Sequence, residues 1–517
     1  MDLKISIAMK KIYLYITLFC VGLSSCSNFL EEDPYGVYSN KNYYNTEADA
    51  LSALLYAYSP INYIEYGARF LFYLTDVTTN QYKNYGRVNE TNLYIWDCNP
   101  NTDEFLYFFK YAYISINRTN SVLENVVKMN NIDQKNKNQI LGEAYFLRAF
   151  NYFMLVRTYG EVPLRKKSVQ GTSGTNAPYG SIQEIYQLII EDLEHAIDLC
   201  GISKHQGRAD KVGAQALLAK VYVTLASSKM TGAPGYDWVE DYEAMYAKAA
   251  GYADEVLNKQ TTYALDPDLL RVYDVNHFSD GTEHIFMTSM NREASGMEGT
   301  YSQLPQMFGI GLPVIWISSS ITGGAGVQKV IDGNQTCWSV FRVDGDFYNT
   351  FDDLDLRKKL MVTTIYNENG TVLATWSPDN INSSNPTENA FYQPFCRKYT
   401  DPNSLANRTS ANIYLIRFAE VALSYAEAAG PTTEGYRWVN AVRERAGLGD
   451  LTPGLDKESF RKAIWEELTF ELAFEGHGLF ELRRTNRVMQ EITNKEVKEA
   501  YAYFFPIPQR EQDLNKQ

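Results

Sequence analysis

Paired segments with helical periodicity constrain the fold of this chain more than any other feature. The segment from Ser181 to Cys200 places its apolar residues at steps of three and four, and Ser181 with Glu184 has the spacing of a capping box. The next segment, Arg208 to Ser228, is rich in alanine and glycine, so a neighbouring helix can approach it closely. Two such helices separated by a short turn predict an αα-hairpin.

Further segments of the same kind flank this pair. Residues 104–127 and 138–160 form an earlier pair, and residues 238–257 carry Trp, Tyr and paired Ala loosely placed as in tetratricopeptide (TPR) repeats. The other segments with helical periodicity are residues 45–60, 412–430, 435–448 and 457–486. Together they predict a TPR-like helical superhelix over about 45–260 and 411–490.

Two stretches lack this period. Residues 61–103 alternate tyrosines with Asn, Thr and Asp, and residues 260–410 mix short apolar runs with long polar loops. The predicted fold is therefore mostly α, built from αα-hairpins, with a large irregular loop-rich insertion that contains short strands. We expect a single domain over residues 26–517, in which the two loop-rich stretches face the ligand.

The N-terminal 25 residues have the pattern of a signal peptide. The apolar run from Ile12 to Leu23 follows two lysines and is shorter than the roughly 20 residues that span a bilayer. It ends in Leu23-Ser24-Ser25-Cys26, which resembles the lipobox of bacterial lipoproteins. Cleavage there predicts a lipidated Cys26 and attachment to the membrane by lipid alone. An ordinary secretory signal is the alternative, and Met9 is an alternative start.

Composition narrows the classes of partner. The net charge of -14 argues against nucleic acid or anionic lipid, because both select basic surfaces. After the signal peptide no apolar run has spanning length. The remaining cysteines form no CxxC pair, and their disulfide state stays open: Cys98, Cys200, Cys337 and Cys396.

No catalytic motif is present. The sequence has no GxSxG, HExxH, Walker A or EF-hand pattern, so no strong motif indicates a reaction class, and no cofactor is expected. Metal ligands are conceivable in "HFSDGTEH" and calcium in "FDDLDLRKKL", but a solvated helix start is the favoured interpretation of the latter. Three charged residues in one apolar segment predict buried ion pairs between helices: Arg417, Glu420 and Glu427.

Aromatic residues in the two loop-rich stretches suggest a sugar site, because sugar C–H faces stack on Trp and Tyr rings while hydroxyls need polar partners. The first stretch offers Tyr85, Arg87, Tyr94, Trp96, Asp97 and Asn99, and the second offers Tyr301, Met307 and Trp316. The alternative interpretation is that Trp96 and Trp316 are core residues that fix the loops to the scaffold.

Seven segments in order resemble the SusD/RagB family of surface glycan-binding lipoproteins. They are the Cys26 lipobox, "GEAYFLRAFNYFMLVRTYGEVPL", "GRADKVGAQALLAKVYVTLA", "YLIRFAEVALSYAEAAG", "VRERAGL", "EELTFELAFEGHGLFELRRTN" and "FPIPQREQDLN". The resemblance implies a right-handed TPR-like superhelix, no enzymatic activity, and a SusC-like TonB-dependent barrel as partner. The chain departs from the family at His477-Gly478-Leu479, where a basic residue and an aromatic usually follow Glu475-Gly476. This puts the local packing in doubt.

The resemblance also implies a site and a location. Trp96 and Asn99 match a family pair that stacks on and hydrogen-bonds to glycans, and Tyr301 and Trp316 fall where the second half of the aromatic site is expected. The chain is thus predicted to be a non-catalytic lipoprotein, anchored in the outer membrane and exposed at the cell surface, that captures a glycan for a transporter. A peptide or protein receptor on the same scaffold, or a surface hydrolase, are the alternatives.

Overall fold

The structure is a computed structural model of the whole chain, and it describes most residues after Tyr43. The described ranges are residues 43–84, 92–169, 176–278, 280–293, 302–309, 317–318, 337–367, 370–377, 390–405 and 408–515. The predicted signal peptide and Cys26 lie outside them.

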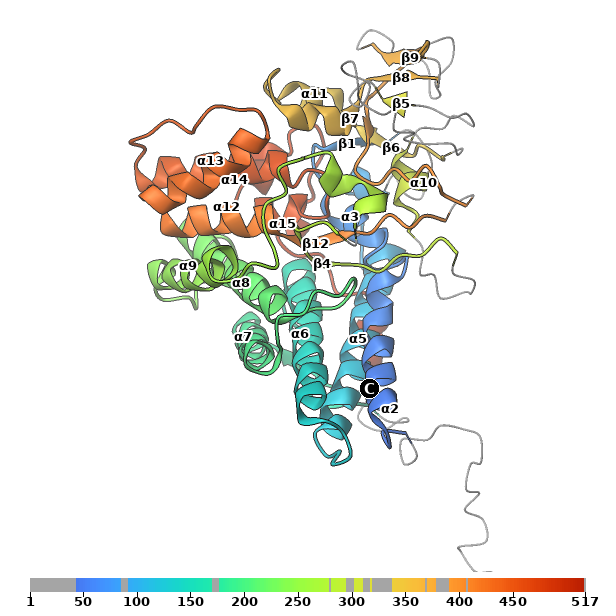
Figure 1. Cartoon of the computed structure of the whole chain (residues 1–517), viewed down its shortest axis with the longest axis vertical. Coiled ribbons are helices and arrows are strands. Elements are labelled where there is room, and N and C mark those ends of the chain that lie inside the picture. The colour runs from blue at the N-terminus through green and yellow to red at the C-terminus, as the bar shows by residue number, and fades with distance from the viewer. Residues whose placement is uncertain are drawn as a thin grey trace, which may run out of the picture.

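Helices dominate these ranges (Figure 1). The α-helices are α2 (Glu47–Tyr58), α3 (Phe70–Thr75), α5 (Asp103–Val126), α6 (Gln134–Tyr159), α7 (Ile182–Leu199), α8 (Lys211–Thr231), α9 (Tyr242–Asn258), α10 (Leu304–Phe308), α11 (Gly345–Asn349), α12 (Phe418–Ala429), α13 (Thr433–Arg445), α14 (Lys457–Glu471), α15 (Gly478–Arg484), α16 (Val488–Glu491) and α17 (Gln509–Leu514). The 3₁₀ helices are η2 (Ser59–Asn62), η3 (Arg271–Tyr273), η4 (Val275–His277), η5 (Leu356–Leu360) and η6 (Glu499–Tyr501).

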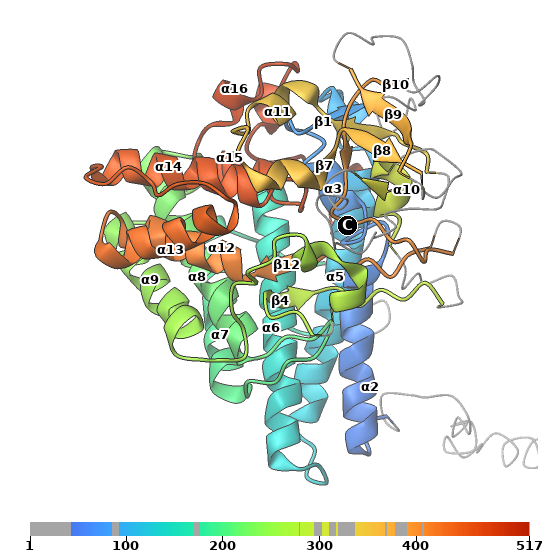
Figure 2. The ribbon, with the colours of Figure 1, turned by 45° about the horizontal axis from the view of Figure 1, so that its top comes forward.

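Each long helix packs against the next along the chain. Contacts join α5 to α6, α6 to α7, α7 to α8 and α8 to α9, and the series continues from α9 to α12 and from α12 to α13 and α14. Figures 1 and 2 show α9, α12, α13 and α14 together on one side, with the strands of the insertion on the other. The predicted mostly-α, TPR-like fold is confirmed.

The hairpin of α7 and α8 forms as its sequence predicts. The Ser181 hydroxyl accepts the N–H of Glu184, whose carboxylate accepts the N–H of Ser181, so the capping box closes. Helix α8 is buried along most of its length and begins at Asp210, whose carboxylate accepts the N–H of Gly213. A helix buried on all sides needs apolar residues around its whole circumference, as this alanine-rich segment provides.

The strands are short and belong to several small sheets. They are β1 (Tyr82–Asn84), β2 (Val162–Pro163), β3 (Tyr179–Gly180), β4 (His284–Met287), β5 (Ile317–Ser318), β6 (Phe341–Val343), β7 (Met361–Val362), β8 (Thr364–Tyr366), β9 (Val372–Trp376), β10 (Ala390–Phe391), β11 (Phe395–Cys396) and β12 (Tyr414–Arg417). One sheet has the order β10-β9-β8-β5, with β10 parallel to β9, and the antiparallel pairs are β1-β6, β11-β7, β12-β4 and β2-β3. The predicted short strands of the insertion are thus present.

Two boundaries differ from the sequence-based expectation. Phe70–Thr75, expected to be an irregular loop, is helix α3, with all six residues buried. Tyr414–Arg417, expected to begin a helix, is strand β12, which pairs with β4 and is buried at every position. A continuous run of apolar residues does not distinguish a buried strand from a buried helix. The strand that pairs with β12, β4, lies far away in the sequence.

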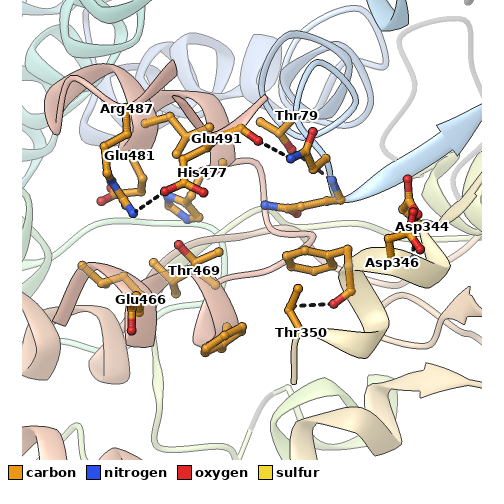
Figure 3. A pocket seen from close by; sticks show the side chains of 18 of the residues that line it. Thr79, Asp344, Asp346, Thr350, Glu466, Thr469, His477, Glu481, Arg487 and Glu491 are labelled. Carbon is orange, nitrogen blue, oxygen red and sulfur yellow. Dashed lines mark hydrogen bonds and ion pairs between the residues drawn. The ribbon is translucent and has the colours of Figure 1, made fainter. Parts of the chain in front are cut away.

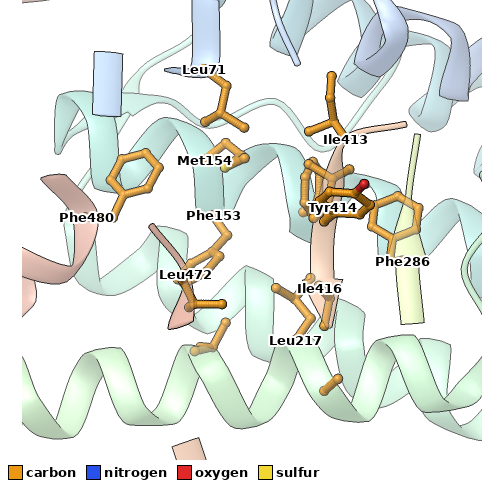
Figure 4. Close-up of a cluster of buried hydrophobic side chains, with 14 of the residues drawn as sticks. Leu71, Phe153, Met154, Leu217, Phe286, Ile413, Tyr414, Ile416, Leu472 and Phe480 are labelled. Atoms are coloured by element: carbon orange, nitrogen blue, oxygen red, sulfur yellow. The ribbon is translucent and has the colours of Figure 1, made fainter. Parts of the chain in front are cut away.

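The hydrophobic core joins the N-terminal and C-terminal helices. Figure 4 shows Leu71, Phe153 and Leu217 with Tyr414 and Leu472, which come from segments far apart in the chain. The last segment also returns to the first helices, because the N–H of Phe505 donates to the Thr158 carbonyl and that of Gln509 to the Pro100 carbonyl, both at 2.8 Å. The C-terminal residues therefore complete the N-terminal part of the scaffold.

Buried ion pairs connect the helices. Arg417 binds Glu475, Glu471 and Glu283, while Glu420 contacts Lys220. Glu427 binds Arg484 at 2.8 Å. The ion pairs predicted from Arg417, Glu420 and Glu427 are confirmed. Because each charge is removed from water, the pairing is needed to offset the cost of burial.

Candidate functional site

Five of the nine predicted site residues lie within the described ranges: Tyr94, Trp96, Asp97, Asn99 and Met307. Arg87, Tyr301 and Trp316 lie outside the described residues, as does Tyr85. Tyr94, Trp96 and Asn99 are described and lie between β1 and α5.

Trp96 is a core residue in this structure. Its side chain is 2% exposed, and its ring lies 5.8 Å from that of Phe505, centroid to centroid. Its indole N–H donates to the Thr78 carbonyl at 3.0 Å. A ring enclosed in this way has no free face for a sugar, so Trp96 follows the alternative interpretation, in which it fixes the loop to the scaffold. Met307, named from the second loop-rich stretch, is also fully buried.

Asn99 and Tyr94 reach the surface. The exposed Asn99 side chain accepts the N–H of Asn101 at 2.9 Å, and the Asn99 N–H donates to the Thr102 hydroxyl, which orders the chain just before α5. Tyr94 is half-buried, and burial, reinforced by the Asp344 carboxylate, raises its pKa to about 12. The Lys495 ammonium lies 4.3 Å from the centroid of the Tyr94 ring. These two residues remain predictions as ligand contacts.

An exposed tryptophan that sequence reasoning missed lies within the second loop-rich stretch. Trp338 is 43% exposed, and its backbone N–H donates to the carbonyl of Gln306 in α10 at 2.7 Å. Only its place in a polar, glycine-containing segment hinted at exposure. Three residues later the chain enters β6, which pairs with β1.

A cavity of about 410 Å³ lies next to this strand pair, with Gln81 just before β1 and Asp344 just after β6 in its wall (Figure 3). This volume falls in the range of about 300–1,000 Å³ typical of small-molecule sites. The lining residues come from the end of α3 to β1, from α11, and from the segment α14 to α16: Thr79, Asn80, Gln81, Asp344, Asp346, Phe347, Thr350, Glu466, Leu468, Thr469, Phe470, Leu472, His477, Gly478, Glu481, Leu482, Arg487, Glu491, Thr493 and Asn494.

The walls of the cavity combine apolar and polar groups. Phe347 is buried and Phe470 half-buried, and hydroxyl, amide and carboxylate side chains surround them. Figure 3 shows Asp344 and Asp346 at one end of the cavity and Glu481 with Arg487 at the other. Such a surface offers many hydrogen-bond acceptors and donors beside ring carbons, which suits a polyhydroxylated ligand.

Hydrogen bonds hold the α11 end of the cavity in place. The Asp344 carboxylate accepts the N–H of Asp346 at 2.9 Å and the side-chain N–H of Asn494 at 3.3 Å, and it lies 3.4 Å from the Lys83 ammonium. The Asn80 side chain donates to the carbonyl of Glu491. These contacts tie α11 and β1 to the segment after α16.

His477 lies within the cavity wall as a neutral group. Burial, with the nearby Lys220 and Arg157 cations, holds the pKa of His477 well below its usual range. Its Nδ1 atom therefore accepts from the Lys220 ammonium, 2.9 Å away. Glu420 in turn contacts Lys220. The departure from the family pattern at this position is thus accommodated by well-packed neighbours.

Lys495 connects the cavity to the predicted loop site. Its ammonium donates to the carbonyls of Val77 and Thr79, and the latter residue lines the cavity. Burial, only partly opposed by the Asp344 carboxylate, lowers the pKa of Lys495 to about 7. Lys495 also contacts Tyr94, so this lysine joins the loop that carries Tyr94 to the cavity wall.

Metal and thiol chemistry find no support in the described part of the chain. No group of three or more His, Cys, Asp or Glu side chains there could hold a metal ion. The favoured interpretation of "FDDLDLRKKL" holds in part, because Asp352 and Asp353 are exposed and Asp355 caps the start of η5. Asp355 itself is buried rather than solvated, and it binds Arg357 at 2.8 Å. Cys98, Cys200, Cys337 and Cys396 are buried free thiols.

Among the described helices, none is long and apolar enough to cross a membrane.

The helical-repeat fold and the sequence together define the class of protein. Residues 28–223 match a SusD-like family described as starch-binding and associating with the outer membrane, and residues 329–517 match the SusD family. The chain belongs to the SusD/RagB family, and the predicted resemblance is confirmed.

Individual relatives align over nearly the whole chain. SusD-like protein P2 of Formosa agariphila is 27% identical over 505 residues, covering 92% of this chain and 91% of the relative. The crystal structure of a SusD homologue from Bacteroides thetaiotaomicron is 25% identical, with a TM-score of 0.73 over 92% of this chain and 97% of the other. Surface glycan-binding protein A of the same organism, solved with laminarihexaose, has a TM-score of 0.69 at 20% identity over 91% and 98%.

Proposed function

We propose that this chain is a non-catalytic cell-surface glycan-binding lipoprotein that captures oligo- or polysaccharide and delivers it to a TonB-dependent outer-membrane transporter. The observation that carries the proposal is a cavity that combines the apolar surface of Phe347 and Phe470 with carboxylate, amide and hydroxyl side chains, on a fold shared with a protein solved with laminarihexaose. Family membership supports binding as the activity. Sugar rings would pack on the apolar part of this surface while their hydroxyls bond to its carboxylate, amide and hydroxyl groups.

The proposed contact surface includes the loop residues and the cavity. Tyr94 and Asn99 are proposed contacts from the loop before α5, where Lys495 joins Tyr94 to the cavity wall. Trp338 offers an exposed ring just before β6. Arg87, Tyr301 and Trp316 remain proposed contacts from outside the described residues. Sugars would stack on exposed rings and hydrogen-bond to amide and carboxylate groups.

The central experiment measures glycan binding by the purified mature protein. A glycan array identifies the ligand, with laminarihexaose as the first probe, and isothermal titration then gives the affinity. We expect binding to at least one oligosaccharide and no release of reducing ends from it. Failure to bind any glycan would contradict the proposal, and turnover that survives repurification would point to a hydrolase.

The anchor and the transporter partner are tested separately. Replacing Cys26 with Ser should abolish acyl labelling of the chain, because the thiol that carries the diacylglyceryl group is lost. Continued palmitate incorporation by the variant would exclude lipidation at Cys26. Affinity purification of the lipidated protein from its own outer membrane should recover a TonB-dependent barrel in equal amount, and recovery without a barrel would contradict delivery.

A further inference from the structure

The charges around the cavity distinguish one class of glycan from another. Five carboxylates line it, and Arg487 is the guanidinium among its described lining residues: the acids are Asp344, Asp346, Glu466, Glu481 and Glu491. His477 lines the cavity without a charge, because burial and the cations around it hold its pKa well below the usual range. Acidic groups therefore outnumber cationic ones in the wall.

Three of the five carboxylates already have cationic partners. Asp344 lies near Lys83, Glu481 binds Arg484 at 2.6 Å, and Glu491 binds Arg487 at 3.3 Å. Arg487 is further engaged, because its Nε donates to the Thr485 hydroxyl and its guanidinium lies 5.5 Å from the Trp465 ring centroid. The guanidinium of the wall is thus engaged within the protein through Nε and Nη1, while its Nη2 has no hydrogen-bond partner among the described residues.

Asp346 and Glu466 differ from the other three acids. Both are exposed and line opposite walls, on α11 and α14, and within the described residues no cation pairs with either. An ionised carboxylate is a strong acceptor for a hydroxyl group, and it repels another anion at close range. The two residues favour hydroxyl groups and oppose carboxylate or sulfate groups.

We propose that this cavity binds an uncharged sugar unit, with Asp346 and Glu466 accepting hydrogen bonds from its hydroxyls, and excludes uronate and sulfated glycans. The inference rests on the proposed function and adds a place and a ligand class to it. Phe347 and Phe470 provide the apolar surface against which the sugar ring packs. Since one hydrogen bond to a charged group is typically worth about tenfold in affinity, loss of either acceptor should be measurable.

The test compares neutral and acidic hexasaccharides on the full mature chain. The array carries laminarihexaose, xylohexaose and mannohexaose against oligomannuronate, oligoguluronate and sulfated hexamers. We expect only neutral ligands to bind, and the double variant Asp346→Asn with Glu466→Gln to bind them about threefold to tenfold more weakly. The matched control is Glu434→Gln with Glu458→Gln, which removes two exposed charges elsewhere on α13 and α14 and should keep full affinity.

A steric variant locates the site. Thr350 is exposed at the cavity rim, so Thr350→Trp should block the cavity without disturbing the core. If Thr350→Trp melts early, Thr493→Trp serves as the second blocking variant, because Thr493 is exposed and also lines the cavity. Loss of neutral binding in a normally melting variant supports the proposal. Unchanged binding in such a variant, or tighter binding of acidic hexamers by the wild type, would overturn it while leaving glycan capture intact. No binding to any hexamer would reject glycan capture as well.

Discussion

Arg417 on β12 and Glu475, which follows α14, form a buried two-point ion pair. Their contacts are 2.7 Å from Nε to Oε2 and 2.9 Å from Nη2 to Oε1, and each residue is only 1% exposed. The planar guanidinium fork matches the carboxylate, so the pair also fixes the orientation of β12 against the end of α14.

Removing one charge of this pair should strongly destabilise the fold. Glu475→Gln keeps the shape but leaves Arg417 and Lys398 with one anion fewer, so we expect a loss of about 3–5 kcal/mol in the free energy of unfolding. Urea unfolding measures this. Glu458→Gln, which removes an exposed partner of Lys462, should cost less than about 1 kcal/mol. Equal stability of the two variants would contradict a structural role for the pair.

Acid should weaken the protein through the same carboxylates. Burial alone would raise the pKa of Glu475, but Arg417 and Lys398 outweigh it and hold that pKa below its ordinary value of 4.5, and Arg445 with Arg417 does the same for Glu471. A lowered folded-state pKa gives stability that is present above pH 4.5 and lost as the pH falls further. The free energy of unfolding should therefore decline below pH 4.5, and less steeply in Glu475→Gln. The same slope in both proteins would contradict the assignment.

Trp96 and Trp338 should respond in opposite ways to truncation to alanine. Trp96→Ala removes a core ring and should cost about 3–5 kcal/mol of stability. Trp338→Ala removes an exposed ring, so the melting temperature should change little while glycan affinity falls about threefold to tenfold. Calorimetry measures the melting temperature of both variants, and isothermal titration measures their glycan affinity. A large fall in melting temperature for Trp338→Ala would make it a scaffold residue.

A glycine in α6 should be less replaceable than one in α8. A Cβ at Gly142 would lie 2.5 Å from the Cys200 sulfur, whereas the nearest atom to a Cβ at Gly213 would be 3.8 Å away. Gly142→Ala should therefore cost about 1–3 kcal/mol through overpacking, and Gly213→Ala should be neutral or stabilise by up to about 1 kcal/mol. Thermal unfolding of both variants provides the comparison. A stabilising Gly142→Ala would show that the helices can move apart freely.

Local sequence predicted the scaffold well wherever the residues of a helix themselves contain its capping box and its apolar period. The apolar period and capping box from Ser181 marked α7, and the alanine-rich pattern marked α8. The alanine-rich α8 packs against both α7 and α9, as expected, but a glycine without room for a Cβ lies in α6, at Gly142, where no sequence feature indicated it. Strand β12 was missed because its pairing with β4 is not encoded within its four residues.

The candidate site was harder to predict than the fold. The environment of Trp96 depends on Phe505, more than 400 residues later, so burial and exposure look the same in its local sequence. The cavity is lined by residues from separate segments, and no single segment carries a motif typical of a sugar site. Trp338 stands out only once α10 and β6 place it. Sequence could indicate an aromatic, loop-rich face, but not which rings remain open on it.

The return of the C-terminal segment to the first helices sets an order for maturation. The Thr158 and Pro100 carbonyls receive their partners from residues 505 and 509, and the Asp76 carboxylate accepts the N–H groups of Gly476 and Gly478 at 2.7 and 3.0 Å. A growing chain therefore cannot complete its N-terminal half until nearly all of it has been synthesised. Until then, buried polar groups near the start lack partners, and the nascent polypeptide must be shielded from aggregation.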